Sequence, residues 1–218
     1  MQVVEQAPSL TATPAAYLPP LENGERLRSG EFLRRYEAMP EVKKAELVEG
    51  KVYMGSPVRA DLHAEPDGLI HLWLATYASR SAGVKFYPNT TLLLDADNTF
   101  QPDAVLCLPP ERGGRTRINA KGYLTGAPEL VAEIAASSAS LDLQEKLHVY
   151  RRCGVNEYLV WRTAENRFDW FLLEDEDYHP QTLGPDGLLR SRVFVGLTLD
   201  PAALLARDGA RLLASLAK

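Results

Sequence analysis

The chain has 218 residues, a hydrophobic content of 45% and a formal net charge of −5 at pH 7. This length is enough for one complete hydrophobic core and leaves little room for two. The negative charge argues against nonspecific polyanion binding over the whole surface, although it is compatible with a local basic patch. No P-loop, GxGxxG, CxxC or HExxH pattern occurs, so the usual signals of nucleotide-binding loops, zinc fingers and zinc proteases are missing.

The two cysteines, Cys107 and Cys153, are isolated in the sequence. They are explained as small hydrophobic residues in a reducing cytoplasm. The first thirty residues lack the basic start and apolar run of a signal peptide, and no stretch reaches roughly 18 apolar residues. We therefore expect a cytoplasmic protein with no membrane partner.

The N-terminal quarter of the chain predicts an arm, a helix and a hairpin. Residues 1–24 contain four prolines and are predicted to form a flexible or draped arm, with one domain over residues 25–218. Ser29 caps a predicted helix over 30–39. Strands over 46–48 and 51–54 form a predicted hairpin around Glu49-Gly50. The longest predicted helix follows over 61–82, with Pro66 in its first turn.

The remaining elements alternate between strands and helices. Strands are predicted over 84–94 and 101–108, with a turn at 95–98 between them and a long loop over 109–129 after them. Further along, we expect a strand over 130–136, a helix over 141–153, strands over 156–161 and 167–173, an acidic turn over 174–178, one or two strands within 187–199, and a helix over 201–217 that breaks near Asp208-Gly209. This order predicts an α/β fold with a mixed central sheet flanked by helices.

A single acid, Glu133, lies inside the run Leu130–Ala136, whose other residues are all small or apolar. Such a run predicts a buried strand. Burying an unpaired carboxylate costs several kcal/mol, so Glu133 must be neutralised, paired or bound to a metal. Asp103 repeats this pattern at the head of the preceding apolar strand, and consecutive strands can lie side by side in a sheet.

Lys146 lies on the helix that follows Glu133. At 100° per residue, Leu143, Leu147 and Tyr150 form the buried seam of this helix, and Lys146 lies about 60° off the centre of that seam, at the edge of the buried face. Two acids at one strand end suit Mg²⁺, which binds through one or two carboxylates and several waters. Two simpler interpretations are a Glu133–Lys146 ion pair without metal, and a Lys146–Asp142 pair on the helix surface.

The predicted loop over 109–129 carries a local basic cluster. Four basic groups lie within eleven residues, at Arg112, Arg115, Arg117 and Lys121. A solvated loop is the simpler interpretation. In an enzyme that acts on nucleic acid, these residues are the best candidates for phosphate contacts.

Six motifs occur in order over roughly residues 25–180. They are Glu46-Leu47-Val48-Glu49-Gly50-Lys51-Val52, His63, Pro102-Asp103, Ala127-Pro128-Glu129-Leu130-Val131-Ala132-Glu133-Ile134, Asp142-x-x-x-Lys146-x-x-x-Tyr150 and Gly154-Val155-x-Glu157-Tyr158. This order resembles the Uma2 family, bacterial proteins with the PD-(D/E)XK nuclease fold that are usually labelled restriction endonucleases. The resemblance implies a restriction-endonuclease-like core over about residues 61–161.

The resemblance also implies the site residues. Asp103 and Glu133 would be catalytic metal ligands, and Lys146 would be a catalytic lysine that has moved from the strand to the helix, because the strand position two after Glu133 is Ala135. Glu46 and His63 are possible accessory residues. The family commonly has Ser-Pro-Ser after the glutamate strand, where this chain has Ser137-Ser138-Ala139 preceded by Ala136. That loop helps to aim the helix that carries Lys146.

The expected function is therefore a Mg²⁺-dependent endonuclease that hydrolyses DNA, with Mn²⁺ as a substitute cation. The alternative is a catalytically inactive nuclease-fold protein that acts as a binding or regulatory module. A third hypothesis is a structural ion-pair cluster in a dimeric scaffold. Nuclease domains that cut both strands often pair, so we expect a homodimer.

Overall fold

The computed structural model describes residues 18–136 and 139–216. Residues 18–24 of the predicted arm lie against the hairpin, where the Gly24 amide donates to the Val52 carbonyl at 2.7 Å and the Leu21 side chain is buried. The rest of the predicted arm, residues 1–17, and the Ser137-Ser138 loop lie outside the described residues.

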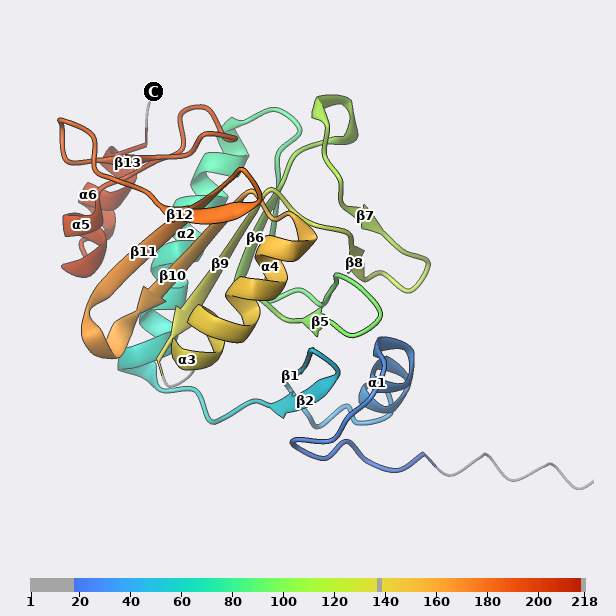
Figure 1. The fold of residues 1–218 in the computed structure, drawn as a ribbon. Coiled ribbons are helices and arrows are strands. Elements are labelled where there is room, and N and C mark those ends of the chain that lie inside the picture. Colours follow the sequence, from blue (N-terminus) through green and yellow to red (C-terminus); the bar gives the residue numbers. More distant parts are fainter. Residues whose placement is uncertain (1–17, 137–138, 217–218) are drawn as a thin grey trace, which may run out of the picture.

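A mixed sheet forms the centre of the molecule, as predicted (Figure 1). β9 and β10 run parallel, and the other neighbouring strands in this sheet pair antiparallel. The strand order is β12 (Asp177–Pro180), β11 (Arg167–Glu174), β10 (Glu157–Arg162), β9 (Leu130–Ala135), β6 (Ala104–Cys107) and β3 (Lys85–Pro88).

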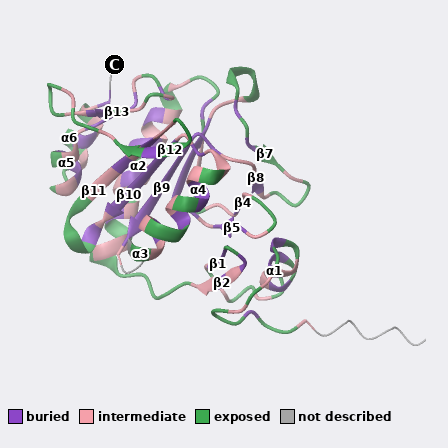
Figure 2. Ribbon diagram, in the orientation of Figure 1, coloured by how far each residue is buried: buried purple, intermediate pink, exposed green. Residues whose placement is uncertain are grey.

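Helices cover both faces of this sheet. Behind it in Figure 1 lies α2 (Glu65–Arg80), with α5 (Pro201–Leu205) and α6 (Gly209–Ala214) beside it, and in front lies α4 (Leu147–Cys153). Side chains alternate across a strand, and in β9 Leu130, Ala132 and Ile134 pack in the cluster with α2, while Val131 and Ala135 pack in the cluster with α4. Glu133 therefore points to the α4 side, as predicted. Figure 2 shows β9 and β10 as the most continuously buried strands.

A second sheet lies beside the first. Its order is β2 (Lys51–Met54), β1 (Ala45–Val48), β5 (Thr99–Phe100), β4 (Leu92–Leu93), β8 (Leu124–Thr125) and β7 (Arg117–Ile118). Helix α1 (Ser29–Tyr36) packs against it through Phe32 and Leu33, in one cluster with Ala45 and Leu47 of β1. Because β1 is extended, Glu46 faces the other way, toward the central sheet.

Four predicted features differ from the structure. The predicted helix over 30–39 is Ser29–Tyr36, and Ser29 is its first residue and not its cap, because the Ser29 hydroxyl donates to the Asp95 carbonyl. The predicted strand over 84–94 is two strands in different sheets, β3 and β4, because the backbone turns at Asn89, whose φ is +47°. The predicted loop over 109–129 contains the helical turn η2 (Pro110–Arg112) and the strands β7 and β8. The predicted acidic turn over 174–178 is shorter, since Asp175 and Glu176 both have positive φ and form a tight hairpin that leads into β12.

Two of the predicted helices begin with a π-helical turn. One is η1 (Ala60–Ala64), directly before α2, and the other is η3 (Asp142–Lys146), which joins α3 (Ala139–Leu141) to α4. The C-terminal region contains the short pair β13 (Leu189–Arg190) and β14 (Thr198–Leu199), then α5 and α6, which are separated near Asp208 as predicted. A further helical turn, η4 (Thr163–Glu165), joins β10 to β11.

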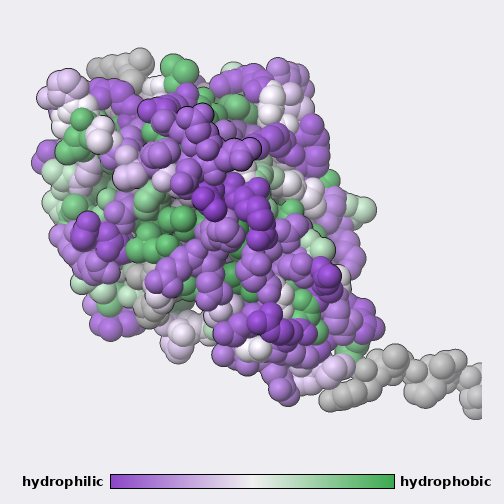
Figure 3. Space-filling model, viewed as in Figure 1, coloured by the Kyte–Doolittle hydropathy of each residue, from purple (hydrophilic) through white to green (hydrophobic). Residues whose placement is uncertain are grey.

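Hydrophilic residues cover most of the face seen in Figure 3, with hydrophobic residues gathered in front of the central strands beside α4. Within residues 18–136 and 139–216, no helix has the length and apolar character needed to cross a membrane.

Candidate active site

Asp103 and Glu133 lie on neighbouring strands at one end of the central sheet. β6 and β9 pair antiparallel with Ala104 opposite Ala132, so Asp103 precedes β6 at the level of Glu133. The Asp103 carboxylate accepts a hydrogen bond of 2.7 Å from the Ile134 amide at Oδ2, which fixes it against β9. Both acids are almost fully buried, with exposures of 1% and 2%. The predicted pairing of their strands is confirmed.

Lys146 lies between three carboxylates. Its Nζ atom is 3.0 Å from Glu133 Oε1, 2.9 Å from Glu46 Oε2 and 3.4 Å from Asp142 Oδ1. The prediction that Lys146 lies at the edge of the buried face is wrong, because its side chain is only 2% exposed. The π-helical turn η3 adds a residue to the turn and shifts the phase of the helix, so the buried positions are Asp142, Lys146, Val149 and Tyr150. The Lys146–Asp142 pair is therefore internal and does not lie on the helix surface.

Glu46 and Tyr150 complete the inner part of the site. Glu46 Oε1 accepts the Gln101 amide at 2.7 Å in addition to Lys146, so β1 is held to the residues that precede β6. The Tyr150 hydroxyl donates to Glu133 Oε1 at 3.0 Å. The sequence placed Glu46 near the site, but it assigned Tyr150 to the core alone. The sequence signals for Tyr150 were its position four residues after Lys146, on the same row of the helix, and its place in the motif Asp142-x-x-x-Lys146-x-x-x-Tyr150.

The outer part of the site surrounds the second oxygen of Asp103. Lys44 Nζ lies 3.2 Å from Asp103 Oδ1, and His63 Nε2 of the turn η1 lies 3.5 Å from the same atom. His71 of α2 contacts the Asp103 carbonyl oxygen at 2.8 Å. Sequence reasoning missed Lys44. Its signal was alternation along an extended segment, because a residue two before Glu46 faces the same side.

Burial and neighbouring charges shift the pKa values of these groups in different directions. Burial raises the pKa of Glu133 to about 8, although Lys146 opposes this shift. Burial would lower the pKa of Lys146, but Glu133, Glu46 and Asp142 raise it well above its usual value. Burial also acts to raise the pKa of Asp103, but the hydrogen bond from His63 and the charge of Lys44 hold it well below its usual range. Burial thus disfavours the charged form of Glu133 in the metal-free site, whereas Lys146 and a bound cation favour it.

The donor set fits a divalent cation by charge and by chemistry. Four buried carboxylates, those of Glu46, Asp103, Glu133 and Asp142, face two ammonium groups, those of Lys44 and Lys146. The two lysines leave two negative charges, to be neutralised by a cation, by protons or by His63, whose Nε2 atom lies 3.5 Å from Asp103 Oδ1. In the described part of the chain, no three His, Cys, Asp or Glu side chains form a ready-made metal cluster. Mg²⁺ does not require one, because it usually keeps several waters and binds through one or two carboxylates.

The basic residues predicted as phosphate contacts lie away from this site. Arg115 donates to the Gly154 carbonyl, which follows the C-terminal end of α4, whereas Lys146 precedes its N-terminal end. The other three side chains also have intramolecular partners: Arg112 with the Ala82 carbonyl, Arg117 with the carbonyls of Gly114 and Thr116, and Lys121 with Glu37. None of these partners belongs to the site.

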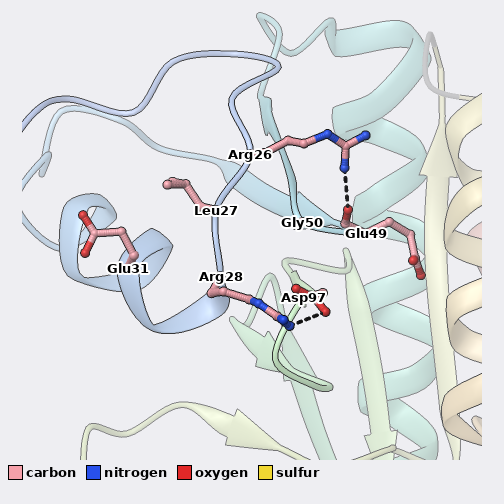
Figure 4. A pocket seen from close by; sticks show the side chains of 7 residues that line it. All are labelled: Arg26, Leu27, Arg28, Glu31, Glu49, Gly50 and Asp97. Carbon is pink, nitrogen blue, oxygen red and sulfur yellow. Dashed lines mark hydrogen bonds and ion pairs between the residues drawn. The ribbon is translucent and has the colours of Figure 1, made fainter.

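A surface hollow of about 620 Å³ lies at the turn of the β1–β2 hairpin, also away from the buried acids (Figure 4). Its charged side chains are already paired within the protein. Arg28 contacts Asp97 at 2.6 Å, and Arg26 donates to the Glu49 carbonyl at 3.4 Å. With its charges satisfied in this way, the hollow is a weaker candidate than the cluster around Glu133.

Comparison with known proteins identifies the family and the fold of the chain. No curated protein matches the chain. A similar solved structure is that of a protein from Anabaena variabilis ATCC 29413 described as "a putative nuclease belonging to DUF820"; it has a TM-score of 0.61 and 14% sequence identity, and the match covers 80% of this chain and 97% of that one. The two proteins therefore share a fold. The model of the Uma2 family, described as "Putative restriction endonuclease", matches residues 30–202, so the chain belongs to the Uma2 family.

Proposed function

We propose that this protein is a Mg²⁺-dependent endonuclease that hydrolyses phosphodiester bonds in DNA, and that Mn²⁺ can replace Mg²⁺. The observation that carries the proposal is the cluster at the end of β6 and β9. Asp103 and Glu133 lie there beside Lys146, with two negative charges not balanced by lysine. Membership of a family described as restriction endonucleases supports the same activity.

Asp103 and Glu133 would hold the cation. Once bound, the ion would polarise a phosphodiester oxygen and make the attacking water more acidic. Tyr150 and Lys146 both contact Glu133 Oε1, which fixes the carboxylate and directs its other oxygen elsewhere. Glu46 holds Lys146 from the opposite side. Lys146 then provides a fixed positive charge next to the position where negative charge develops on the phosphate.

The reaction itself is a simple displacement. The oxygen of water forms a bond to phosphorus, the bond between phosphorus and the leaving ester oxygen breaks, and that oxygen takes up a proton. Fixed charges around the phosphate account for most of the rate enhancement in such reactions. The hydrogen bonds to Asp103 and Glu133 keep both carboxylates in place for this role.

A second candidate function is a catalytically inactive binding or regulatory module. The burial of Lys146 favours this function. Its side chain is 2% exposed and already contacts three carboxylates. A structural ion-pair cluster has this appearance too. Metal binding separates these possibilities, because a purely structural cluster does not need a cation.

The test is cleavage of supercoiled plasmid and of single-stranded DNA with Mg²⁺ or Mn²⁺. Asp103→Asn, Glu133→Gln and Lys146→Ala are each expected to lower the rate by at least about 100-fold, because each removes a charge that stabilises the transition state. Glu157→Gln is the matched control: it changes a buried glutamate on the neighbouring strand, and its cleavage rate should stay within a few-fold of the unmodified protein.

Cleavage that persists in all three site variants would come from a contaminating nuclease. If the unmodified protein cleaves no DNA with either cation and calorimetry detects no Mg²⁺ binding, the nuclease function is excluded and the binding or regulatory module remains. Light scattering on the same samples tests the expected homodimer.

A further inference from the structure

Two lysines reach the candidate site, and they are held in different ways. Lys146 contacts three carboxylates and is 2% exposed at its side chain. Lys44 contacts one carboxylate, Asp103, at 3.2 Å, and its side chain is 35% exposed. If Lys146 moved away, it would leave several buried acids unpaired, which is costly. Lys44 can move at lower cost, because it forms an ion pair with one of these acids and its side chain is already 35% exposed.

The backbone around Lys44 keeps its side chain at this position. Lys44 directly precedes β1, and its carbonyl accepts the Gly55 amide at 2.9 Å, so the hairpin is closed at this end. A Cβ atom on Gly55 would lie only 3.0 Å from Lys44 Cβ. Glycine at position 55 therefore leaves the space that the Lys44 stem occupies. Extended geometry then places Lys44 and Glu46 on the same side of the strand, toward the site.

The contact between Lys44 and Asp103 competes with cation binding. A divalent ion held by Asp103 would lie close to the Lys44 ammonium, and like charges repel strongly at short range in a partly buried site. The lysine side chain has four methylene groups joined by rotatable bonds, so its ammonium group can move toward solvent without any change in the backbone. The group it would meet there is the substrate, whose phosphate oxygens are good acceptors for an ammonium ion.

We propose that Lys44 is a substrate-contacting residue: it neutralises Asp103 in the metal-free protein and moves to a non-bridging phosphate oxygen of DNA when a divalent cation occupies the site. This proposal rests on the proposed nuclease function. It assigns different roles to the two lysines. Lys146 organises the carboxylates, and Lys44 binds the phosphate. It also places the phosphate contact at the N-terminal end of β1, away from the basic cluster at Arg112–Lys121.

The experiment measures cation binding and DNA binding separately in the full chain. Mg²⁺ affinity is measured by calorimetry without DNA. DNA affinity is measured by fluorescence anisotropy with a labelled 20-base-pair duplex in Ca²⁺ over a series of KCl concentrations, and the duplex is checked for cleavage afterwards. The variants are Lys44→Met and Lys44→Arg. The control is Lys85→Met, which removes the same charge from an exposed position at the far end of β3, where Lys85 pairs with Cys107 and not with the residues next to Asp103.

Lys44→Met is expected to bind Mg²⁺ at least as tightly as the unmodified protein, because a competing ammonium group is gone. Its DNA affinity should fall several-fold, and the slope of log affinity against log salt should become less negative by about 0.9, the value for one lost phosphate contact. Lys44→Arg should restore the slope. Lys85→Met should leave both measurements unchanged.

Two results would overturn the proposal while leaving the nuclease function intact. One is a salt slope for Lys44→Met equal to that of the unmodified protein. The other is loss of Mg²⁺ affinity in Lys44→Met, which would mean that Lys44 only supports the carboxylates. If the unmodified protein binds neither Mg²⁺ nor DNA, the proposed function fails, and the role of Lys44 fails with it.

Discussion

Two neighbouring parallel strands each carry a buried glutamate, and the two glutamates are stabilised in different ways. Glu157 of β10 is 1% exposed and Glu133 of β9 is 2% exposed. Glu157 is surrounded by neutral donors, namely Ser191 Oγ at 2.8 Å, Trp170 Nε1 at 3.1 Å and two backbone amides, of Arg192 and Val193, at 2.7 and 3.0 Å. These donors satisfy the carboxylate completely and anchor the segment before β14 to the sheet.

Glu133 is instead stabilised by a cation and lies among other acids. Its contacts are Lys146 and Tyr150. Burial raises its pKa most, and the carboxylates of Asp142, Asp103 and Glu46 act in the same direction. The comparison shows that burial of an acid does not by itself indicate a functional site. The distinguishing feature is the group of several acids and lysines around Glu133, which a bound cation can complete, whereas Glu157 is a single acid held by neutral donors.

The largest expected effect is that of Lys146→Met on stability. Removing this charge leaves three buried carboxylates, those of Glu46, Glu133 and Asp142, without their common cation. Breaking such a buried cluster lowers the free energy of unfolding by about 3–5 kcal/mol. Denaturant unfolding in EDTA, with Lys85→Met as the control, measures it. A loss of unfolding free energy below about 1 kcal/mol would show that protons neutralise the acids at little cost. Glu133 and Glu157 would then differ only in their protonation state.

A smaller effect is expected for Glu157→Gln. The amide oxygen can replace the carboxylate oxygen that accepts from Ser191, Arg192 and Val193, but its NH₂ group cannot accept from Trp170. One unsatisfied buried donor costs about 1–3 kcal/mol. The same denaturant measurement gives the value, and calorimetry should show unchanged Mg²⁺ affinity. A variant that loses Mg²⁺ binding would mean that both glutamates belong to one site.

The pH dependence of stability tests the same contrast through the protonation of Glu133. The pKa of Glu133 is about 8 in the folded protein and about 4.5 when unfolded, so between these values the folded state binds more protons. Stability must then fall as the pH rises through this window. The pKa values of His63 and His71 are also raised. The main cause for His63 is its hydrogen bond to Asp103, and for His71 the hydrogen bond to Asp67 outweighs the effect of burial. The contribution of these histidines to stability therefore also decreases as the pH rises above about 6.5.

Thermal unfolding in EDTA from pH 5 to pH 8 tests this expectation. The melting temperature should decrease by several degrees over the range, since 1 kcal/mol corresponds to about 2–4 °C for a chain of this size. Glu133→Gln should remove most of the decrease and leave the histidine part. If the melting temperature of Glu133→Gln decreases as much as that of the unmodified protein, the titrating group is not Glu133. The contrast between the two glutamates would then be weaker. The whole window should shift when Mg²⁺ is added.

The sequence predicted the mixed sheet and the neighbouring strands of Asp103 and Glu133 because burial leaves a strong pattern in β9: a charged residue within an apolar run. It also placed Glu46 and His63 near the site through the family resemblance. Those two residues remain accessory candidates. Their observed contacts are with Lys146 and Asp103.

Other features left no local pattern. The split of residues 84–94 between two sheets depends on one left-handed residue, Asn89, and on strand pairings far along the chain. Alternation places Lys44 on the same side as Glu46, but its position beside Asp103 depends on how the hairpin packs against the residues before β6, which the spacing within residues 40–55 does not specify. The basic cluster at Arg112–Lys121 has the composition of a phosphate-binding loop, yet its partners are carbonyls and acids of the same chain.

The two π-helical turns, η1 and η3, each carry a residue of the candidate site, His63 in one and Lys146 in the other. This makes the site sensitive to chain length. Deleting one residue from 142–145 would replace the π turn by an ordinary α-helical turn and change which of these residues face Lys146, while α4 and the fold remain. Related chains could therefore lose or regain this lysine contact through a single insertion or deletion, with every chemically important residue still present in the sequence.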